Sequence, residues 1–262
     1  MTLVAHLREL RFRLVVSFTA IAVGVGFAYA FWEPIYNFLR QPYCHTAAGR
    51  HDCNLYALGI FDQFHVRLQV SIIAGIILAA PVWLYHIARF LTPALYRRER
   101  RYAAGFFLSA LILFAAGATM AYLTVSRGLD IFLSLGGGHI VAILSVQSYL
   151  SFITVLLVVF GIAFEFPLVV LFLNLTGVLS AQRMRRSRRG VIFALFVISA
   201  ILTPTTDPFT FLAMAIPLAA LYEGCILIAR LRARTTHHTN ELDQFHADLA
   251  TQAGYPELSA HL

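Results

Sequence analysis

The amino-acid sequence predicts an all-α, polytopic membrane protein with six transmembrane helices, the last two of them short. Of its 262 residues, 59% are hydrophobic and only 13% are charged, and its mean hydropathy is +0.74. Charge-free apolar blocks of about 20 residues, the length that crosses a bilayer, recur along the chain. Soluble domains carry about a quarter charged residues, and one core of this size cannot bury so much apolar surface. A soluble enzyme, a secreted disulfide scaffold and a disordered chain are therefore excluded.

Charge-free runs place the first four helices. Each of the first three runs is long enough for one crossing, at residues 14–32, 68–88 and 102–126. The next two runs join across Glu165 and together are too long for a single crossing. Glycines at 136–138 and polar side chains within 145–148 favour a loop there, so we expect the fourth helix at about residues 150–176.

The last two predicted helices differ from the first four. The fifth covers residues 190–202, and these 13 residues extend only about 20 Å at 1.5 Å per residue. The sixth, at about residues 209–229, contains Glu223. A helix that is shorter than the roughly 30 Å apolar core can force the bilayer to thin locally.

Arginines indicate how these helices are oriented. All 20 basic residues are arginines, and they fall between apolar blocks instead of forming one basic face, which argues against nucleic-acid binding. Sixteen lie at the N-terminus, in the second-to-third and fourth-to-fifth connections and after the sixth helix, against four on the opposite side. The positive-inside rule then places both termini in the cytoplasm. We expect a membrane domain at residues 1–234 and a polar, disordered cytoplasmic tail at 235–262.

The chain lacks the sequence patterns of common catalytic and metal sites. No P-loop, HExxH, GxSxG or paired CxxC pattern occurs, so we expect no catalytic residue, metal or cofactor. Cys44 and Cys53 lie beside His45 and His51 in the first outer loop. They are free thiols, a disulfide or a metal site, with free thiols favoured over a disulfide and a disulfide over a metal. Cys225, inside the sixth helix, is expected to pack against its neighbours.

Glu165 is the most informative polar residue of the sequence, because it lies well inside the fourth helix. A carboxylate near the bilayer centre costs about 2.5–3.5 kcal/mol on insertion scales. Pro167 has no N–H, so the carbonyl of Ala163 loses its helical partner. Glu165 therefore either hydrogen-bonds at this kink or lines a polar surface that a substrate or a partner helix contacts, and we favour the second role.

For Asp207, Glu9 and Glu99, the sequence by itself favours a structural role over a binding role. Glu223 raises the same question as Glu165 but lies nearer the membrane surface. Asp207 follows a short outer turn and can cap the sixth helix. Glu9 and Glu99 each sit among arginines, where an i,i+4 pair such as Glu9 with Arg13, or solvated loop charge, is favoured over a binding site.

Several segments together resemble the TatC family, the multispanning subunit of the twin-arginine protein translocase. In chain order they are residues 6–14 (HLRELRFRL), 80–81 (AP), 90–101 (FLTPALYRRERR), 164–167 (FEFP), 202–204 (LTP), 207–209 (DPF) and 215–217 (AIP), followed by Glu223. These matches are colinear over about residues 5–230 and agree with six helices whose ends are both inside. No single motif is specific, but the ordered set is.

The resemblance implies a non-enzymatic receptor for signal peptides that carry two consecutive arginines on folded cargo. The site residues that it implies are Glu9, Arg11, Phe90, Glu99 and Arg100. It further implies TatA- or TatB-like single-span partners, a homo-oligomer within a larger complex, energy from the proton gradient, and the cytoplasmic membrane of a prokaryote. The alternative is a proton-coupled small-solute transporter with Glu165 as its relay, but the chain shows no internal repeat of the kind common in such transporters.

The chain also departs from the family pattern. A basic residue common near the start of the second helix is Gln69 here, and a glutamine frequent in the sixth helix, linked in the family to single-span partners, is Phe211. The Gln-x-Trp that often precedes the loop phenylalanine is replaced by the sequence HIA at residues 86–88. We assign Thr203, Asp207 and Phe211 to the outer turn or to partner docking, and Glu165 and Glu223 to an intramembrane polar surface used in translocation.

Overall fold

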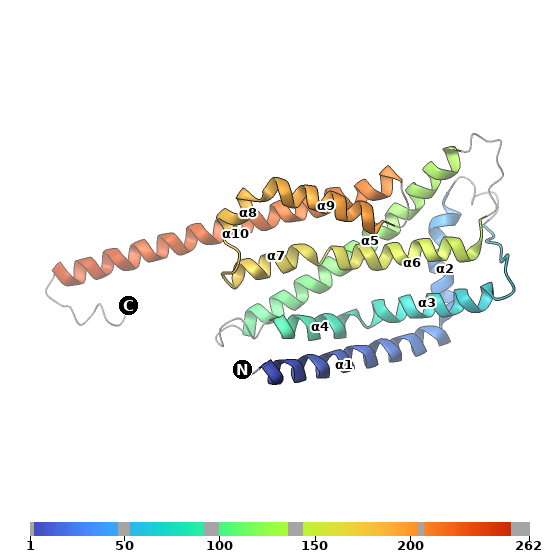
Figure 1. Ribbon diagram of the computed structural model, residues 1–262, viewed down its shortest axis with the longest axis horizontal. Helices are drawn as coiled ribbons and strands as arrows, with labels where there is room; N and C mark the ends of the chain where they lie inside the picture. Colours follow the sequence, from blue (N-terminus) through green and yellow to red (C-terminus); the bar gives the residue numbers. More distant parts are fainter. Residues whose placement is uncertain (1–2, 47–52, 92–99, 136–143, 204–206, 253–262) are drawn as a thin grey trace.

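The computed structural model describes residues 3–46, 53–91, 100–135, 144–203 and 207–252, and within them the chain is helical apart from short turns and one isolated bridge between Tyr56 and Ser145. The helices run back and forth between the two ends of an elongated bundle (Figure 1). This confirms the predicted all-α membrane class. In chain order the helices are α1 (Leu3–Ala30), α2 (Trp32–Cys44), α3 (Asp62–Leu78), α4 (Ala80–Leu91), α5 (Arg100–Leu135), α6 (Val146–Ala163), α7 (Phe166–Leu175), α8 (Ala181–Arg186), α9 (Arg188–Leu202) and α10 (Pro208–Gln252).

Most of the predicted spans coincide with long apolar helices. In the described part of the chain, the segments long and apolar enough to cross a membrane are Leu7–Ala30, Ala104–Ile131, Val146–Leu175 and Pro208–Leu231. Helices α3 and α4 together form one further segment that is long and apolar enough to cross a membrane, if the bent pair is counted as a single span. The remaining predicted helix is α9, which at 15 residues is as short as expected. The count of six crossings stays a prediction.

The second predicted span is not one helix but two. Helices α3 and α4 meet at a bend of 48° at Ala79. Pro81 follows this bend, and a proline ring displaces the backbone of the preceding turn and removes one N–H donor. The indole nitrogen of Trp83 donates to the carbonyl oxygen of Ile76 at 3.1 Å, which gives a carbonyl at the bend a partner. The prediction of an uninterrupted helix at 68–88 was therefore wrong.

Helix ends differ from the sequence predictions in several places. The fourth span begins at Val146, inside the stretch predicted to lie in a loop, and α5 continues nine residues past its predicted end at 126, to Leu135. The backbone of α10 remains helical to Gln252, where the sequence favoured an end near 229 and disorder from 235. Helices α2 and α8 lie in connections for which the sequence predicts no secondary structure.

Cys44 and Cys53 form a disulfide at the end of the molecule opposite the N-terminus. The expectation that free thiols are favoured was therefore wrong. The bond ties the end of α2 to the segment that leads to the Tyr56–Ser145 bridge. Within the described residues no group of three metal-ligating side chains occurs, and Cys225 is a buried free thiol, as expected.

Glycines allow the central helices to approach one another closely. Gly24 on α1 faces Gly75 on α3, and a Cβ on Gly24 would lie 2.8 Å from the Gly75 carbonyl oxygen. A Cβ on Gly75 would lie 2.5 Å from the backbone nitrogen of Val25. In a bilayer the tails are as apolar as the side chains, so close packing through small residues supplies much of the helix–helix attraction.

We predict that Gly75→Ala destabilises the protein, because the new methyl group clashes with the backbone of α1 and a backbone cannot shift cheaply. The expected cost is about 1–3 kcal/mol, typical of overpacking. Thermal unfolding in one detergent, followed by circular dichroism, measures the change in midpoint.

Gly26→Ala is the matched control, because a Cβ at Gly26 meets nothing within 4 Å. It should leave the midpoint unchanged or raise it, since alanine favours a helix over glycine by up to about 1 kcal/mol. Equal midpoints for the two variants would contradict the close packing of α1 on α3.

Candidate functional site

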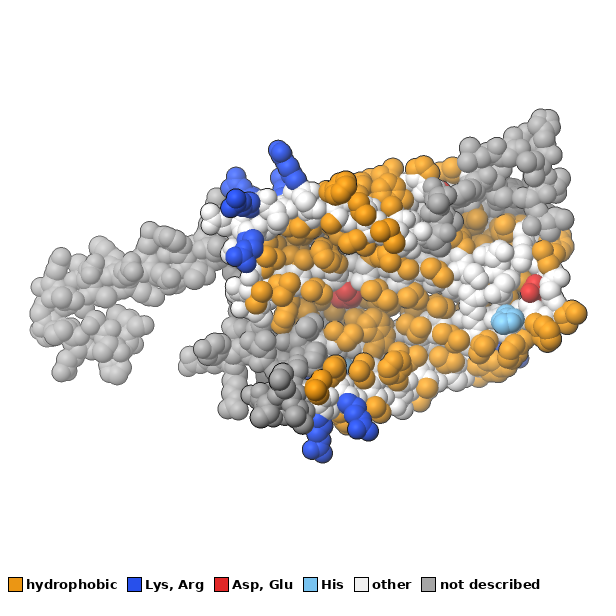
Figure 2. Space-filling model, viewed as in Figure 1, with side chains coloured by type: hydrophobic (Ala, Val, Ile, Leu, Met, Phe, Trp, Pro, Cys, Tyr) orange, Lys and Arg blue, Asp and Glu red, His pale blue; other side chains and the backbone are white. Residues whose placement is uncertain are grey.

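Arginine side chains gather at one end of the bundle, which we call the arginine-rich end. The starts of α1, α5 and α9, the ends of α4 and α7, and α8 all lie there (Figure 1). Figure 2 shows the basic side chains at this end and an apolar middle. The basic residues with described side chains on these elements are Arg8, Arg11, Arg13, Arg89, Arg183, Arg185, Arg186, Arg188 and Arg189, and all but Arg13 are exposed.

Glu9 supplies a carboxylate at this end. It lies on the second turn of α1 and forms an ion pair with Arg13, four residues later, as predicted for this spacing. The Glu9 side chain is 29% exposed and that of Arg13 is 12% exposed. Such pairs contribute only about 0.3–0.5 kcal/mol, so Glu9 can exchange this guanidinium for another at small cost. Arg11 is exposed on the same helix.

Helix α4 brings a second set of side chains to α1. The two helices are in contact, and Arg13 and Arg89 both lie within electrostatic range of His86 on α4. Arg89 donates to the Tyr85 hydroxyl at 3.1 Å. The Glu9–Arg13 pair therefore lies beside the last turns of α4, where Phe90 follows in sequence.

Only part of the predicted five-residue site falls within the description. The structure places the backbone of Phe90 near the end of α4 and that of Arg100 at the start of α5, and α4 packs on α5. Both positions share the arginine-rich end with Glu9 and Arg11 (Figure 1). Glu99, and the side chains of Phe90 and Arg100, lie outside the described residues.

Glu165 lies at a break in the predicted fourth helix. Helix α6 ends at Ala163 and α7 begins at Phe166, so Glu165 is the N-cap residue of α7 and Pro167 lies in its first turn. The Glu165 carboxyl has one buried oxygen, and no hydrogen bond to it occurs among the described residues. Among the described residues, the expected hydrogen bond between this carboxyl and the carbonyl of Ala163 is therefore not observed. Figure 2 shows acidic side-chain atoms within the apolar band, over the α6–α7 region.

A polar network joins α3 and α6, and the sequence predictions do not include it. The Gln69 side-chain nitrogen donates to the Thr154 hydroxyl at 2.8 Å and to the Ser151 hydroxyl at 3.3 Å. Gln147 donates to the side-chain oxygen of Gln69 at 3.2 Å. The spacing of Gln147, Ser151 and Thr154 places them on one face of α6. This helical spacing is the signal that could have found the network.

Glu223 is not an isolated polar group. It forms an ion pair with Arg188, which connects α10 to the first turn of α9. The pair lies at the arginine-rich end, so Glu223 is nearer the membrane surface than Glu165, as the sequence indicated. The assignment of Glu223 to an intramembrane polar surface stays a prediction. The ion pair with Arg188 at the arginine-rich end does not favour it.

The outer turn joins α9 to α10 at the opposite end. Asp207 caps α10 as predicted, because its carboxylate accepts from the Thr210 backbone N–H at 2.6 Å. Thr203 is the C-cap residue of α9 and is buried. Phe211 packs edge-on against Phe196 with ring centroids 5.8 Å apart. The contact between Phe211 and Phe196 joins the two helices, and partner docking at this turn stays a prediction.

Comparisons with known proteins agree on one family. The family model described as "Sec-independent protein translocase protein (TatC)" matches residues 5–217. The chain is 41% identical over 258 residues to the Sec-independent protein translocase protein TatC of Frankia casuarinae, covering 95% of this chain and 71% of that protein. It is 38% identical over 237 residues to the same protein of Aquifex aeolicus, covering 89% of this chain and 97% of the relative.

Solved structures resemble the chain over most of its length. A crystal structure of the twin arginine translocase receptor TatC matches with a TM-score of 0.74 and 37% identity, covering 86% of this chain and 98% of that one. A second crystal structure of the same receptor, in DDM, matches with a TM-score of 0.75 and 36% identity and covers 86% of this chain and 99% of its own.

Proposed function

The chain belongs to the TatC family of Sec-independent protein translocase proteins, and from this premise we propose that its arginine-rich end is the receptor site for signal peptides with two consecutive arginines. These peptides are carried by proteins that are already folded. The observation that supports the site is the position of Glu9 on α1, beside the end of α4 and at the same end as the start of α5. Glu99, in the α4–α5 connection, supplies the second carboxylate.

The chemistry of two carboxylates suits a pair of arginines. A guanidinium forms two parallel hydrogen bonds with a carboxylate, a geometry that lysine cannot reproduce. Phe90 provides an apolar surface for the hydrophobic part of the peptide. Arg11 and Arg100, together with Arg13, compete for the same carboxylates, so the affinity is modest and falls as salt is added.

The protein works with other subunits and not as an enzyme. Single-span proteins of the TatA and TatB kind dock on α9 and α10 near Thr203, Asp207 and Phe211, and copies of this chain assemble with them in a larger complex. This placement rests on the resemblance to the family and on the packing of Phe211 against Phe196 between the two helices. The proton gradient drives export.

The orientation follows from the two chemically different ends. We place the protein in the cytoplasmic membrane of a prokaryote with both termini in the cytoplasm, so that the arginine-rich end faces inward. The Cys44–Cys53 disulfide then lies outside, where disulfides persist. The relatives from Frankia casuarinae and Aquifex aeolicus are bacterial proteins, which agrees with this location.

The short helix α9 suggests how folded cargo passes. Its 15 residues extend about 22 Å, which is less than the roughly 30 Å apolar core. A bilayer that thins beside α9 lowers the barrier for a bulky cargo. Glu165, with its carboxyl unpartnered at the break between α6 and α7, contributes a polar contact for the signal peptide or a partner helix after the first docking step.

We predict that Glu99→Ala and Glu9→Ala each weaken binding of a twin-arginine peptide by about tenfold or more, since hydrogen bonds to charged groups contribute about 1.5–3 kcal/mol. Glu99→Gln should be nearly as damaging, because an amide keeps the shape and loses the charge. Fluorescence anisotropy of a labelled peptide with the purified protein in nanodiscs gives the affinities.

Glu33→Ala is the matched control, because Glu33 is an exposed carboxylate on α2 at the other end of the molecule. The double variant should lose less than the sum of the single losses, since both carboxylates hold one diarginine. Wild-type affinity in Glu99→Ala, or strict additivity of the two changes, would refute a shared site.

A separate prediction concerns Glu165. Glu165→Ala should reduce export of a twin-arginine reporter strongly while peptide docking and thermal stability stay near wild type, because the carboxyl makes no hydrogen bond that holds the helix break. Glu165→Gln should keep partial activity, since an amide can still donate and accept hydrogen bonds. Reporter export and peptide cross-linking are measured in the same membranes.

Ile162→Ala, at an exposed apolar position three residues earlier, controls for surface changes in this region. Normal export by Glu165→Ala would eliminate the transport role. A large loss of thermal stability would show instead that the carboxyl maintains the break.

A further inference from the structure

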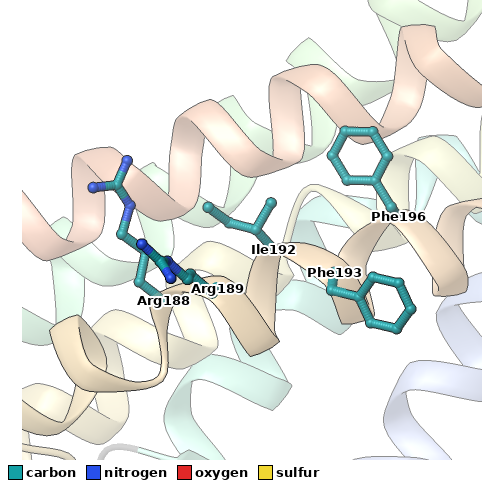
Figure 3. A pocket seen from close by; sticks show the side chains of 5 residues that line it. All are labelled: Arg188, Arg189, Ile192, Phe193 and Phe196. Atoms are coloured by element: carbon teal, nitrogen blue, oxygen red, sulfur yellow. The ribbon is translucent and has the colours of Figure 1, made fainter.

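An open pocket of about 690 Å³ lies along the first half of α9, a size typical of ligand sites. Figure 3 shows its lining: two guanidinium groups at one end and three apolar side chains along the rest. The lining residues are Arg188, Arg189, Ile192, Phe193 and Phe196.

The spacing of these residues makes the pocket amphiphilic along the helix axis. Residues three and four apart lie on one helical face, so Arg189, Phe193 and Phe196 form one row. From Arg189 to Phe196 this row extends about 10 Å into the apolar layer. The Phe193 side chain is 71% exposed, so the apolar part is open to the bilayer.

The end of the pocket that is lined by Arg188 and Arg189, which we call its head, carries an excess of positive charge. The basic side chains of α8 and of the start of α9 are exposed, and the printed sequence from 166 to 206 contains no acidic residue. Among the described residues, Glu223 is the acidic partner of Arg188, and Arg189 has no acidic partner. The head of the pocket therefore attracts an anion at the level of the lipid headgroups.

We propose that this pocket binds an anionic phospholipid, with its phosphate at the guanidinium groups of Arg189 and Arg188 and an acyl chain against Ile192, Phe193 and Phe196. Guanidinium pairs with phosphate through parallel hydrogen bonds. The opposite chemistry of the two ends selects an amphiphile: a free phosphate has nothing to place on the phenylalanines, and a purely apolar helix has nothing to place on the arginines.

The ion pair with Glu223 adds a competing partner. The Glu223 carboxylate and the lipid phosphate bind the same guanidinium, so occupation of the pocket and the contact between α9 and α10 at this end depend on each other. A lipid that draws Arg188 toward its phosphate loosens the tie to α10, and removal of the carboxylate strengthens lipid binding.

Photo-cross-linking tests the proposal. Phe193→benzoylphenylalanine is prepared in the full-length chain, which is placed in nanodiscs of phosphatidylcholine with or without phosphatidylglycerol, and the adducts are identified by mass spectrometry. We expect phosphatidylglycerol adducts well above its mole fraction. Arg189→Gln should lower their yield about fivefold, the factor for one basic residue near an anionic surface.

Two further variants make the result decisive. Arg185→Gln removes an exposed arginine of α8 that does not line the pocket, and it should change the yield little. Glu223→Gln should raise the yield, because it frees Arg188.

Three outcomes would overturn the proposal. In the nanodiscs, the adducts follow the mole fractions of the two lipids, or Arg189→Gln and Arg185→Gln lower the adduct yield equally. When the same Phe193 variant is cross-linked in native membranes, the adducts are formed with a single-span protein and not with lipid. The first means acyl contact alone, the second general electrostatic accumulation, and the third a protein partner on this face.

Discussion

The free-energy cost of placing charge in an apolar membrane is the constraint on which the rest of this structure depends. It confines most described arginines to one end of the bundle, the end at which α1 begins and α4 and α7 finish. Because of the same cost, an acidic side chain in or near the apolar layer needs a partner or a polar surface. Glu9 has Arg13 and Glu223 has Arg188, whereas Glu165 stands without a hydrogen bond in the described residues. The proposed division between recognition at the membrane surface and passage through the membrane rests on this distribution.

The same constraint explains where prediction from sequence succeeded. Spans of apolar residues and the clustering of arginines are direct consequences of the bilayer, so the helical class, most of the spans and the shortness of α9 were predicted correctly. The Glu9–Arg13 pair and the Asp207 cap were also predicted, because they depend on spacings within one helix.

Features that depend on three-dimensional contacts were not predicted. The bend at Ala79 depends on Pro81 and on the hydrogen bond from the Trp83 indole to the Ile76 carbonyl, and neither feature changes the hydropathy of the segment. The network of Gln69 with Ser151 and Thr154 joins helices about 80 residues apart in the chain. The Cys44–Cys53 disulfide depends on how the outer segments fold together. Glu99 lies outside the described residues, so its role remains an expectation from the family.

The central claim is that a twin-arginine signal peptide docks at the arginine-rich end, where α1, α4 and α5 come together. The most direct measurement is photo-cross-linking from a diazirine placed next to the diarginine of a synthetic peptide, with the purified protein in nanodiscs and attachment sites mapped by mass spectrometry. We expect attachment to the first turns of α1 and to the end of α4, and little labelling from a twin-lysine peptide. Attachment near α2 at the opposite end, or equal labelling by the lysine peptide, would contradict the account.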